Sequence, residues 1–235
     1  MTKRIWELDA LRGLCILVMA AVHLVYDLVE LYRLIPGEIS GSFRFLMEWG
    51  GVVFVMLSGC CATLGRNPVR RGFQIFSCGM LITVVTMGLV LLGFDPGSII
   101  WFGVLHCLGA CMVMWGFLKK LPRRWLLWAC IAAVMAGFWL NHRSFSFSWL
   151  VPLGFVPYFF VSADYFPLLP YLGFFLLGAL LGEKCYPERK SLLPGVNAHR
   201  EPIGFLCFCG RHSLPIYLLH QPAITGLLWL LSTNF

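Results

Sequence analysis

Apolar residues dominate this chain in long stretches that are separated by short polar segments. Each stretch is close to the length of about 20 residues that an α-helix needs to cross the hydrocarbon core of a bilayer. The stretches lie near residues 10–30, 43–63, 72–93, 99–118, 124–140, 166–183 and 213–232. The pattern therefore predicts an all-α, polytopic membrane helix bundle of about seven transmembrane helices, formed by a single domain over residues 1–235.

Two segments do not follow this pattern. Residues 141–165 are rich in aromatic side chains, but Pro152 and Pro157 interrupt their apolar part. We expect a re-entrant or interfacial segment here, with an eighth helix over residues 147–163 as the alternative. Residues 184–212 are rich in proline, glycine and charge, which indicates a loop or a surface helix on the cytosolic side.

The composition is that of an integral membrane protein, because 59% of the residues are hydrophobic and only 12% are charged. Of the 18 Lys and Arg residues, only Arg33, Arg44 and Arg143 fall on one side of the predicted topology. Since Lys and Arg collect in cytosolic loops, we expect the N-terminus in the cytosol and the C-terminus outside. The net charge of +7 follows from this asymmetry and from contact with anionic lipid, so nucleic acid is not an expected partner.

The ten cysteines all fall within predicted helices or on the predicted cytosolic side, so we expect no structural disulfide. Cys60–Cys61 and the Cys207-x-Cys209 pair lack the two- to four-residue gap that is common in zinc sites. We therefore expect no metal and interpret these cysteines as small packing residues.

The first predicted helix carries Asp9, Arg12, His23 and Asp27, which exclude a cleavable signal peptide. Arg12 and His23 are eleven residues apart, so at about 100° per residue both lie on nearly the same helix face, about 16 Å apart along the axis. Because ionisable side chains are costly in lipid, we expect both to face protein or water. His23 and Asp27 are spaced i, i+4, which predicts that they lie on one face about 6 Å apart.

A polar layer is predicted in the outer half of the bundle. Residue counting places His23, Glu48 and His106 at a similar depth, and a carboxylate beside His23 can hold one imidazole tautomer and raise its basicity. A buried histidine near carboxylates is suited to act as general base for a hydroxyl or an amine. His23, Asp27, Glu48 and His106 are therefore the candidate catalytic residues. The alternative is that they form structural hydrogen bonds between helices.

The inner half of the bundle carries arginines instead. Asp9 and Arg12 are spaced i, i+3, which allows an ion pair. Other arginines lie at the predicted cytosolic helix ends: Arg66, Arg70, Arg71, Arg123 and Arg124. Guanidinium groups suit phosphate, so these residues are candidates for binding a phosphate-bearing ligand. The alternative is that they only fix the topology against anionic lipid.

Several motifs resemble those of known families. LDALRG with the Arg12-x10-His23 spacing, followed by VFVMLSG at residues 53–59, resembles the transmembrane acyltransferase superfamily. Over nearly its whole length, the chain resembles more closely the bacterial branch of the heparan-alpha-glucosaminide N-acetyltransferase catalytic-domain family. The matching stretches are HLVYD (23–27), FGVLHCLG (102–109), DYFPLLPYLGFFLLGALLG (164–182) and SLPIYLLHQP (213–222).

The resemblance implies an acetyl-CoA-dependent transmembrane acyltransferase in a bacterial cytoplasmic membrane. Such an enzyme moves an acetyl group from cytosolic acetyl-CoA to the hydroxyl or amine of a sugar or glycan at the outer side. His23 matches the histidine of the superfamily and Arg12 its arginine. The implied partners are coenzyme A, the glycan acceptor and the lipid bilayer.

In the mechanism that we expect, His23 is the general base or the acetyl acceptor, oriented by Asp27 or Glu48. His106 or a tyrosine stabilises the developing oxyanion. A hypothesis of another class is a small-molecule or proton-coupled transporter in which Arg12, His23 and Asp27 form the polar path.

The phosphates of coenzyme A are expected near Arg12, Asp9 and the arginines at the helix ends. His220 is predicted in the cytosolic half of the last helix. It either lines the path of the coenzyme or hydrogen-bonds a backbone carbonyl that Pro215 or Pro222 leaves free. The small residues of LSG at residues 57–59 predict a close approach of two helices.

Overall fold

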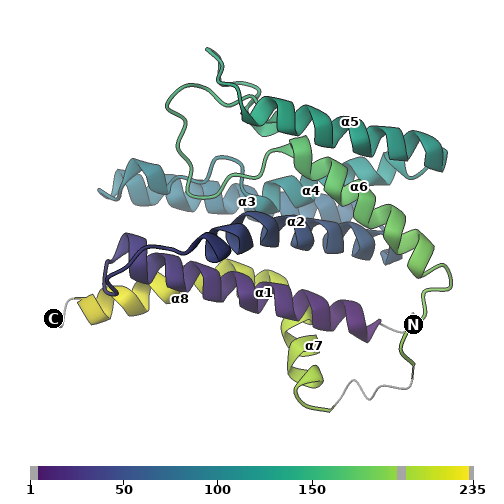
Figure 1. Cartoon of the computed structure of the whole chain (residues 1–235), viewed down its shortest axis with the longest axis horizontal. Coiled ribbons are helices and arrows are strands. Elements are labelled where there is room, and N and C mark those ends of the chain that lie inside the picture. Colours follow the sequence, from purple (N-terminus) through teal and green to yellow (C-terminus); the bar gives the residue numbers. More distant parts are fainter. Residues whose placement is uncertain (1–4, 195–199, 233–235) are drawn as a thin grey trace. The chain divides into compact units, whose positions relative to one another are not determined.

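The computed structural model describes residues 5–194 and 200–232, and the elements found there are helices joined by loops (Figure 1). The helix α1 continues into a π-helical segment, η1, and two short 3-10 segments, η2 and η3, lie in loops. The elements are α1 (Trp6–Tyr26), η1 (Asp27–Leu31), α2 (Gly41–Leu64), α3 (Pro68–Leu91), η2 (Pro96–Ser98), α4 (Val104–Leu118), α5 (Arg123–Asn141), η3 (Val151–Leu153), α6 (Leu168–Cys185), α7 (Ile203–Arg211) and α8 (Ser213–Ser232). The all-α prediction is confirmed.

Six of the described helices are long and apolar enough to cross a membrane. They are α1 with η1 (Trp6–Leu31), α2, α3, α5, α6 and the Ser213–Leu231 part of α8. The remaining predicted stretch, residues 99–118, folds as α4, which is apolar but has only 15 residues. Residues 99–103 before it are not helical, so the hydropathy pattern overestimated the length of this helix.

Residues 142–167 contain no α-helix and only the short turn η3. The alternative of an eighth helix over residues 147–163 is therefore wrong, and the prolines in this segment explain why, since proline interrupts helical hydrogen bonding. Its predicted place at the membrane surface stays a prediction. Residues 184–212 include the helix α7, and its predicted place at the cytosolic surface stays a prediction.

The described helices form two compact units, which are considered separately. Unit 1 consists of residues 5–54, 186–194 and 200–232, and it contains α1, η1, the first part of α2, α7 and α8. Unit 2 consists of residues 55–185, and it contains the rest of α2 with α3, α4, α5 and α6. That both units belong to a single domain stays a prediction.

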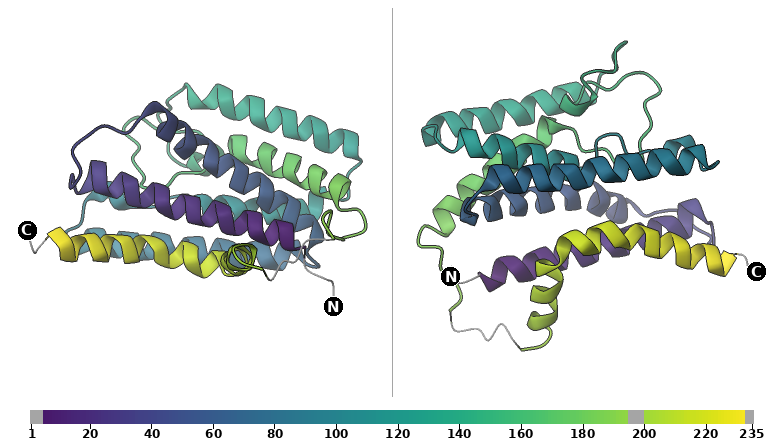
Figure 2. Two further views of the ribbon diagram at one scale, coloured as in Figure 1. Left: turned by 60° about the horizontal axis from the view of Figure 1, so that its bottom comes forward. Right: turned by 180° about the vertical axis from the view of Figure 1, so that it is seen from behind.

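In unit 1, α1 and α8 lie side by side and run in the same direction (Figure 2). Hydrogen bonds to α8 from α1, from η1 and from the residue after η1 follow the same order along both segments: Arg12 with Ser213, Asp27 with Gln221 and Tyr32 with Thr225. Two parallel helices in this register bring the polar face of α1 against the first half of α8.

The helix α7 packs on α1 through glycines. A Cβ on Gly13 would collide with the carbonyl oxygen of Leu206, and a Cβ on Gly210 would collide with that of Asp9. Both views in Figure 2 show α7 crossing α1 at a steep angle. Since only glycine allows the two backbones to approach this closely, these positions fix the start of α1 against the segment that leads into α8.

Unit 2 is also built from helix pairs that meet at small residues. The antiparallel helices α3 and α4 touch at Gly72 and Gly109, and α2 meets α6 at Gly59 and Gly178. A Cβ on Gly59 would collide with the carbonyl oxygen of Phe175. The predicted close helix approach at LSG is confirmed.

Two extended segments lie side by side at one end of unit 2. The N–H of Ala163 donates to the carbonyl of Ile99 (3.2 Å), and the N–H of Phe166 donates to that of Phe102 (2.9 Å). Further along, the hydroxyl of Tyr165 donates to the carbonyl of Val151 (2.7 Å), and burial raises the pKa of Tyr165. These bonds satisfy irregular backbone that would be costly to leave unpaired beside an apolar bundle.

Candidate functional site

Arg12 of α1 points to the neighbouring helix α8. Its Nη2 donates to Oγ of Ser213, the first residue of α8, at 2.5 Å. Ser213 is buried and Arg12 is half-buried, so this hydrogen bond is partly shielded from solvent. The prediction that Arg12 faces protein is confirmed, while its ion pair with Asp9 stays a prediction.

His23 also faces α8, where it lies against His220. The two ring centres are 5.0 Å apart and the ring planes are inclined by 60°. Residue counting predicts these residues in opposite halves of the bundle, and that prediction is wrong. Residue counting assumed that both helices begin at one level, whereas α8 begins beside the side chain of Arg12, already part of the way along α1.

Asp27 lies at the point where α1 changes to the π-helical η1, and it is only 2% exposed. Its Oδ2 accepts a hydrogen bond from Nε2 of Gln221 at 2.8 Å. The carboxylate was predicted to orient His23, but the hydrogen bond that the structure gives it comes from α8. The spacing along α1 could not reveal this donor, because Gln221 is distant in sequence. Short π-helical turns are frequent at functional sites.

Two buried atoms of α8 lack a hydrogen-bond partner among the described residues: Nε2 of His220 and Oε1 of Gln221. The other polar atom of each side chain is engaged, since Nδ1 of His220 lies 2.6 Å from the carbonyl oxygen of Tyr217 and Nε2 of Gln221 donates to Asp27. Buried polar atoms are nearly always paired, so exceptions call for an explanation such as catalysis. We call His23, Asp27, His220 and Gln221 the α1–α8 polar cluster.

A backbone carbonyl partner for His220 was predicted, and the carbonyl is that of Tyr217. It is not one that a proline leaves free, because Pro215 and Pro222 release the carbonyls four residues before them. The alternative, that His220 lines the path of a coenzyme, stays a prediction.

Glu48 was predicted to join this layer. It lies in unit 1 on the first part of α2, and its side chain is exposed. Within the described residues, the structure records no hydrogen bond or ion pair between Glu48 and the α1–α8 polar cluster. Its proposed orienting role therefore lacks structural support and stays a prediction.

His106 lies in unit 2, near the start of α4, and it is 2% exposed. Its Nδ1 accepts a hydrogen bond from the N–H of Gly103 at 3.2 Å, so its Nε2 carries the proton in the neutral ring. That Nε2 lies 3.3 Å from Oγ1 of Thr83, which in turn donates to the carbonyl of Ile100 at 2.6 Å. Both ring nitrogens are thus occupied by the chain itself, which favours the structural alternative for this residue.

Asp164 completes the start of α4. Its Oδ2 accepts a hydrogen bond from the N–H of Val104 at 2.9 Å, so a carboxylate caps the positive end of the helix dipole. The spacing of polar residues along the chain does not predict this cap. The available signal was its place in the family-like stretch DYFPLLP, directly after the aromatic segment.

The remaining candidate arginines gather at one end of unit 2. The junction of α2 and α3 carries Arg66, Arg70 and Arg71, the start of α5 carries Arg123 and Arg124, and all of these side chains are exposed. Helix packing brings these ends together, because Val69 lies at Gly116 and Cys60 at Gly182.

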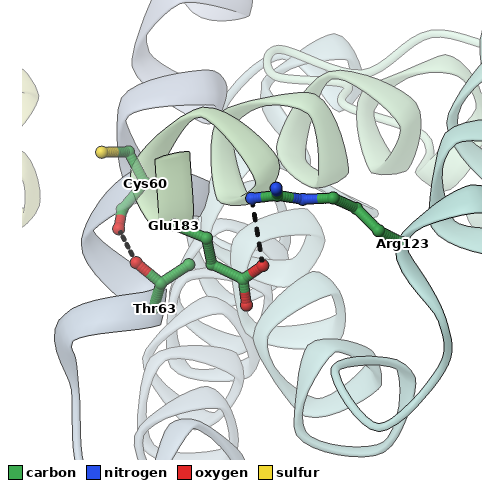
Figure 3. Close-up of polar contacts among 4 residues, drawn as sticks. All are labelled: Cys60, Thr63, Arg123 and Glu183. Atoms are coloured by element: carbon green, nitrogen blue, oxygen red, sulfur yellow. Dashed lines mark hydrogen bonds and ion pairs between the residues drawn. The ribbon is translucent and has the colours of Figure 1, made fainter. Parts of the chain in front are cut away.

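Figure 3 shows the same end of unit 2 in detail. Nη2 of Arg123 lies 4.0 Å from Oε2 of Glu183 in α6, and Oγ1 of Thr63 donates to the carbonyl of Cys60 at 2.8 Å. Arg12 and Asp9 belong to unit 1, so a phosphate site that joins them with these arginines stays a prediction.

No cluster of three metal-ligating side chains is found in the ranges that the structure describes. The ten cysteines all lie in the described ranges, and none of them forms a disulfide there.

Sequence reasoning missed the residues that α8 contributes. Gln221 and Ser213 supply the partners of Asp27 and Arg12, yet neither is ionisable and neither was singled out. A signal was present for Gln221, because HQ at residues 220–221 places two polar side chains together in an apolar helix.

Comparison with known proteins gives one match. Residues 4–222 match the family described as heparan-alpha-glucosaminide N-acetyltransferase, catalytic. This range includes all four residues of the α1–α8 polar cluster. No curated protein and no solved structure matches the chain. Because the match covers most of the 235 residues, the chain belongs to the heparan-alpha-glucosaminide N-acetyltransferase catalytic-domain family.

Proposed function

We propose that this protein moves an acetyl group from acetyl-CoA to a hydroxyl or an amine of a sugar or glycan, with His23 as general base or acetyl acceptor. Family membership supports an acetyl transfer, and the six long apolar helices support a membrane enzyme. The observation that carries the proposal is the α1–α8 polar cluster. It holds an imidazole, His23, next to a second imidazole and near a buried carboxylate.

The position of the cluster supports a functional purpose. Ionisable groups within membrane helices are costly and mark substrate or proton pathways when they persist. Here Arg12, His23 and Asp27 all turn to one neighbouring helix. A merely structural set would leave fewer buried atoms unpaired than Nε2 of His220 and Oε1 of Gln221.

The proposed reaction needs few groups. In the direct route, a nitrogen of His23 removes the proton from the acceptor hydroxyl or amine, and that nucleophile attacks the thioester carbonyl. The carbon–sulfur bond breaks, and the imidazolium returns the proton to the thiolate of coenzyme A. In the alternative route, His23 itself attacks the thioester and carries the acetyl group to the acceptor.

Arg12 is suited to hold the donor. It lies about 16 Å from His23 along α1, which is close to the reach of the pantetheine arm between the phosphates of coenzyme A and its thioester. The bond to Ser213 holds the guanidinium at the start of α8. The exposed arginines of unit 2 are further candidates for the phosphates.

The proposed direction of transfer is from the cytosol to the outside. Because α1 and α8 run in the same direction, the chain must cross the membrane an odd number of times between them. The helices between them in the chain that can cross are α2, α3, α4, α5 and α6, so their number is odd only if the short α4 also crosses. This supports termini on opposite sides of the membrane. The excess of Lys and Arg at the helix ends and loops predicted to be cytosolic supports the cytosol as the side of the N-terminus.

Purified protein in detergent or nanodiscs tests the proposal. We expect saturable binding of coenzyme A, and slow loss of labelled acetyl from acetyl-CoA to water or to an added amino sugar. His23→Ala should lower the transfer rate by on the order of 10²–10⁴-fold, because it removes the general base or acetyl acceptor. Coenzyme A binding should be unchanged.

The matched control is His142→Ala, since His142 is an exposed histidine that follows α5. It should transfer acetyl at the wild-type rate. Retained transfer in a folded His23→Ala protein would contradict the role of His23. Coenzyme A binding without any transfer by the wild-type protein would contradict the enzymatic proposal and favour transport.

A further inference from the structure

The tautomer of His220 follows from its neighbours. Its Nδ1 lies 2.6 Å from the carbonyl oxygen of Tyr217, and a carbonyl can only accept a hydrogen bond. Nδ1 therefore carries the proton. In a neutral ring, Nε2 then presents a lone pair and can only accept.

That lone pair is buried and has no partner among the described residues. The ring that faces it from α1 is His23. The nearby Asp27 is an acceptor and is already engaged by Gln221, and Arg12 is engaged by Ser213 at the start of α8. Within this helix pair, an N–H of His23 is therefore the donor best placed to serve Nε2 of His220.

The spacing of the rings fits such a bond. An N–H···N hydrogen bond of about 3 Å between two imidazoles separates their ring centres by roughly 5 Å. The observed separation is 5.0 Å. The separation of the ring centres is thus compatible with this bond, which the ring orientations in the structure do not make.

We propose that His220 is the positioning residue for His23, whose N–H donates to Nε2 of His220 in the working state. This bond holds His23 in one tautomer and leaves its second nitrogen as a lone pair for the chemistry. It assigns to His220 the task that the sequence analysis gave to Asp27. The catalytic consequence rests on the proposed acetyl transfer, whereas the bond between the rings does not.

The proton balance is simple. The free nitrogen of His23 takes the proton of the acceptor hydroxyl or amine as the new bond to the acetyl carbon forms. It gives that proton to the coenzyme A thiolate after the carbon–sulfur bond breaks. The second N–H of His23 stays on the bond to His220 throughout and disperses the charge of the transient imidazolium.

Nitrogen NMR of protein labelled with ¹⁵N-histidine tests the bond directly. We expect Nε2 of His220 to give the signal of an unprotonated nitrogen that accepts a hydrogen bond, and His23→Phe should abolish the hydrogen-bond shift. His220→Asn should change the tautomer signals of His23, because an Asn amide can still serve Tyr217 but does not reach His23. A His220 signal that is indifferent to His23→Phe would overturn the proposal.

Transfer kinetics test the consequence. His220→Asn should lower kcat by about tenfold or more, a part of the factor that general-base catalysis supplies, with KM for acetyl-CoA unchanged. His220→Gln places an amide oxygen near the original Nε2 and should restore much of kcat. The matched control is His212→Asn, because Nδ1 of His212 also lies at a backbone carbonyl, that of Phe208 at 2.9 Å, but its ring is exposed.

The outcomes separate the two proposals. If the wild-type protein transfers acetyl and the kcat of His220→Asn equals that of His212→Asn, the positioning role is refuted and the acetyl transfer is not. No transfer by the wild-type protein, together with the expected NMR signals, would refute the acetyl transfer and leave the ring pair standing. A larger KM with unchanged kcat in His220→Asn would instead assign His220 to the path of the coenzyme and contradict the proposal.

Discussion

Two histidine sites in the described part of the chain differ in what their surroundings leave unpaired. At the start of α4, both nitrogens of His106 are occupied by Gly103 and Thr83. In the α1–α8 polar cluster, Nε2 of His220 is buried without a partner among the described residues, and its ring lies against that of His23. A residue type alone therefore does not identify a functional site in a membrane helix; the difference lies in whether the chain itself satisfies each polar atom.

The largest expected structural effect is at His106. His106→Ala leaves the buried N–H of Gly103 without its acceptor and opens a cavity, so it should lower the free energy of unfolding by about 2–3 kcal/mol. Thermal unfolding in detergent measures this loss. His23→Ala is the comparison variant and should unfold near the wild-type temperature. Equal losses in the two variants would remove the distinction between the sites.

Asp164 tests the same network from its other side. Asp164→Ala removes the carboxylate that caps α4 and should cost about 1 kcal/mol of stability. Thermal unfolding again reports the loss, and Asp164→Asn should recover part of it because an amide oxygen also accepts from the N–H of Val104. If Asp164→Ala instead abolished transfer while unfolding normally, this end of unit 2 would have to be counted among the functional residues.

Thr83 gives a smaller effect. Thr83→Val removes the hydroxyl that links His106 to the carbonyl of Ile100, and side-chain hydrogen bonds between membrane helices contribute about 1 kcal/mol or less. Thr63→Val is the matched control, because its hydroxyl serves only the carbonyl of Cys60 in its own helix. A greater loss in Thr63→Val than in Thr83→Val would contradict the closed network at His106.

The smallest effect is expected for a substitution of Glu48, and it tests whether this residue belongs to the α1–α8 polar cluster. Because its side chain is exposed, Glu48→Gln should change kcat by less than about twofold, whereas a carboxylate that orients the base contributes far more. The acetyl transfer assay measures this ratio. A loss as large as that of His23→Ala would restore Glu48 to the orienting role that the sequence predicted.

The structure agrees with the sequence where one helix is enough to decide the outcome. The apolar stretches predicted the positions of the helices, because hydropathy depends on consecutive residues. The helical repeat predicted that Arg12 and His23 share a face, and both do contact α8. The small residues of LSG predicted a close helix contact, because the lack of a side chain at the glycine lets two helix backbones approach closely.

The errors arise where two segments must be combined. The length of α4 was overestimated, because residues 99–103 are held in extended form by residues 163–166. His220 was assigned to the wrong depth, because residue counting cannot know that α8 begins beside Arg12. The donor to Asp27, Gln221, was missed for the same reason, because it lies far away in the chain.

The sequence by itself determined a helical membrane protein, the helices that form it and the polar face of α1, because each of these depends on the order of neighbouring residues. Only the tertiary structure decided that both nitrogens of His106 are hydrogen-bonded, whereas Nε2 of His220 has no partner among the described residues. That outcome depends on the register between α1 and α8 and on the loops that cap α4. A hydrogen bond needs two groups within about 3 Å, and the sequence specifies only one group at a time.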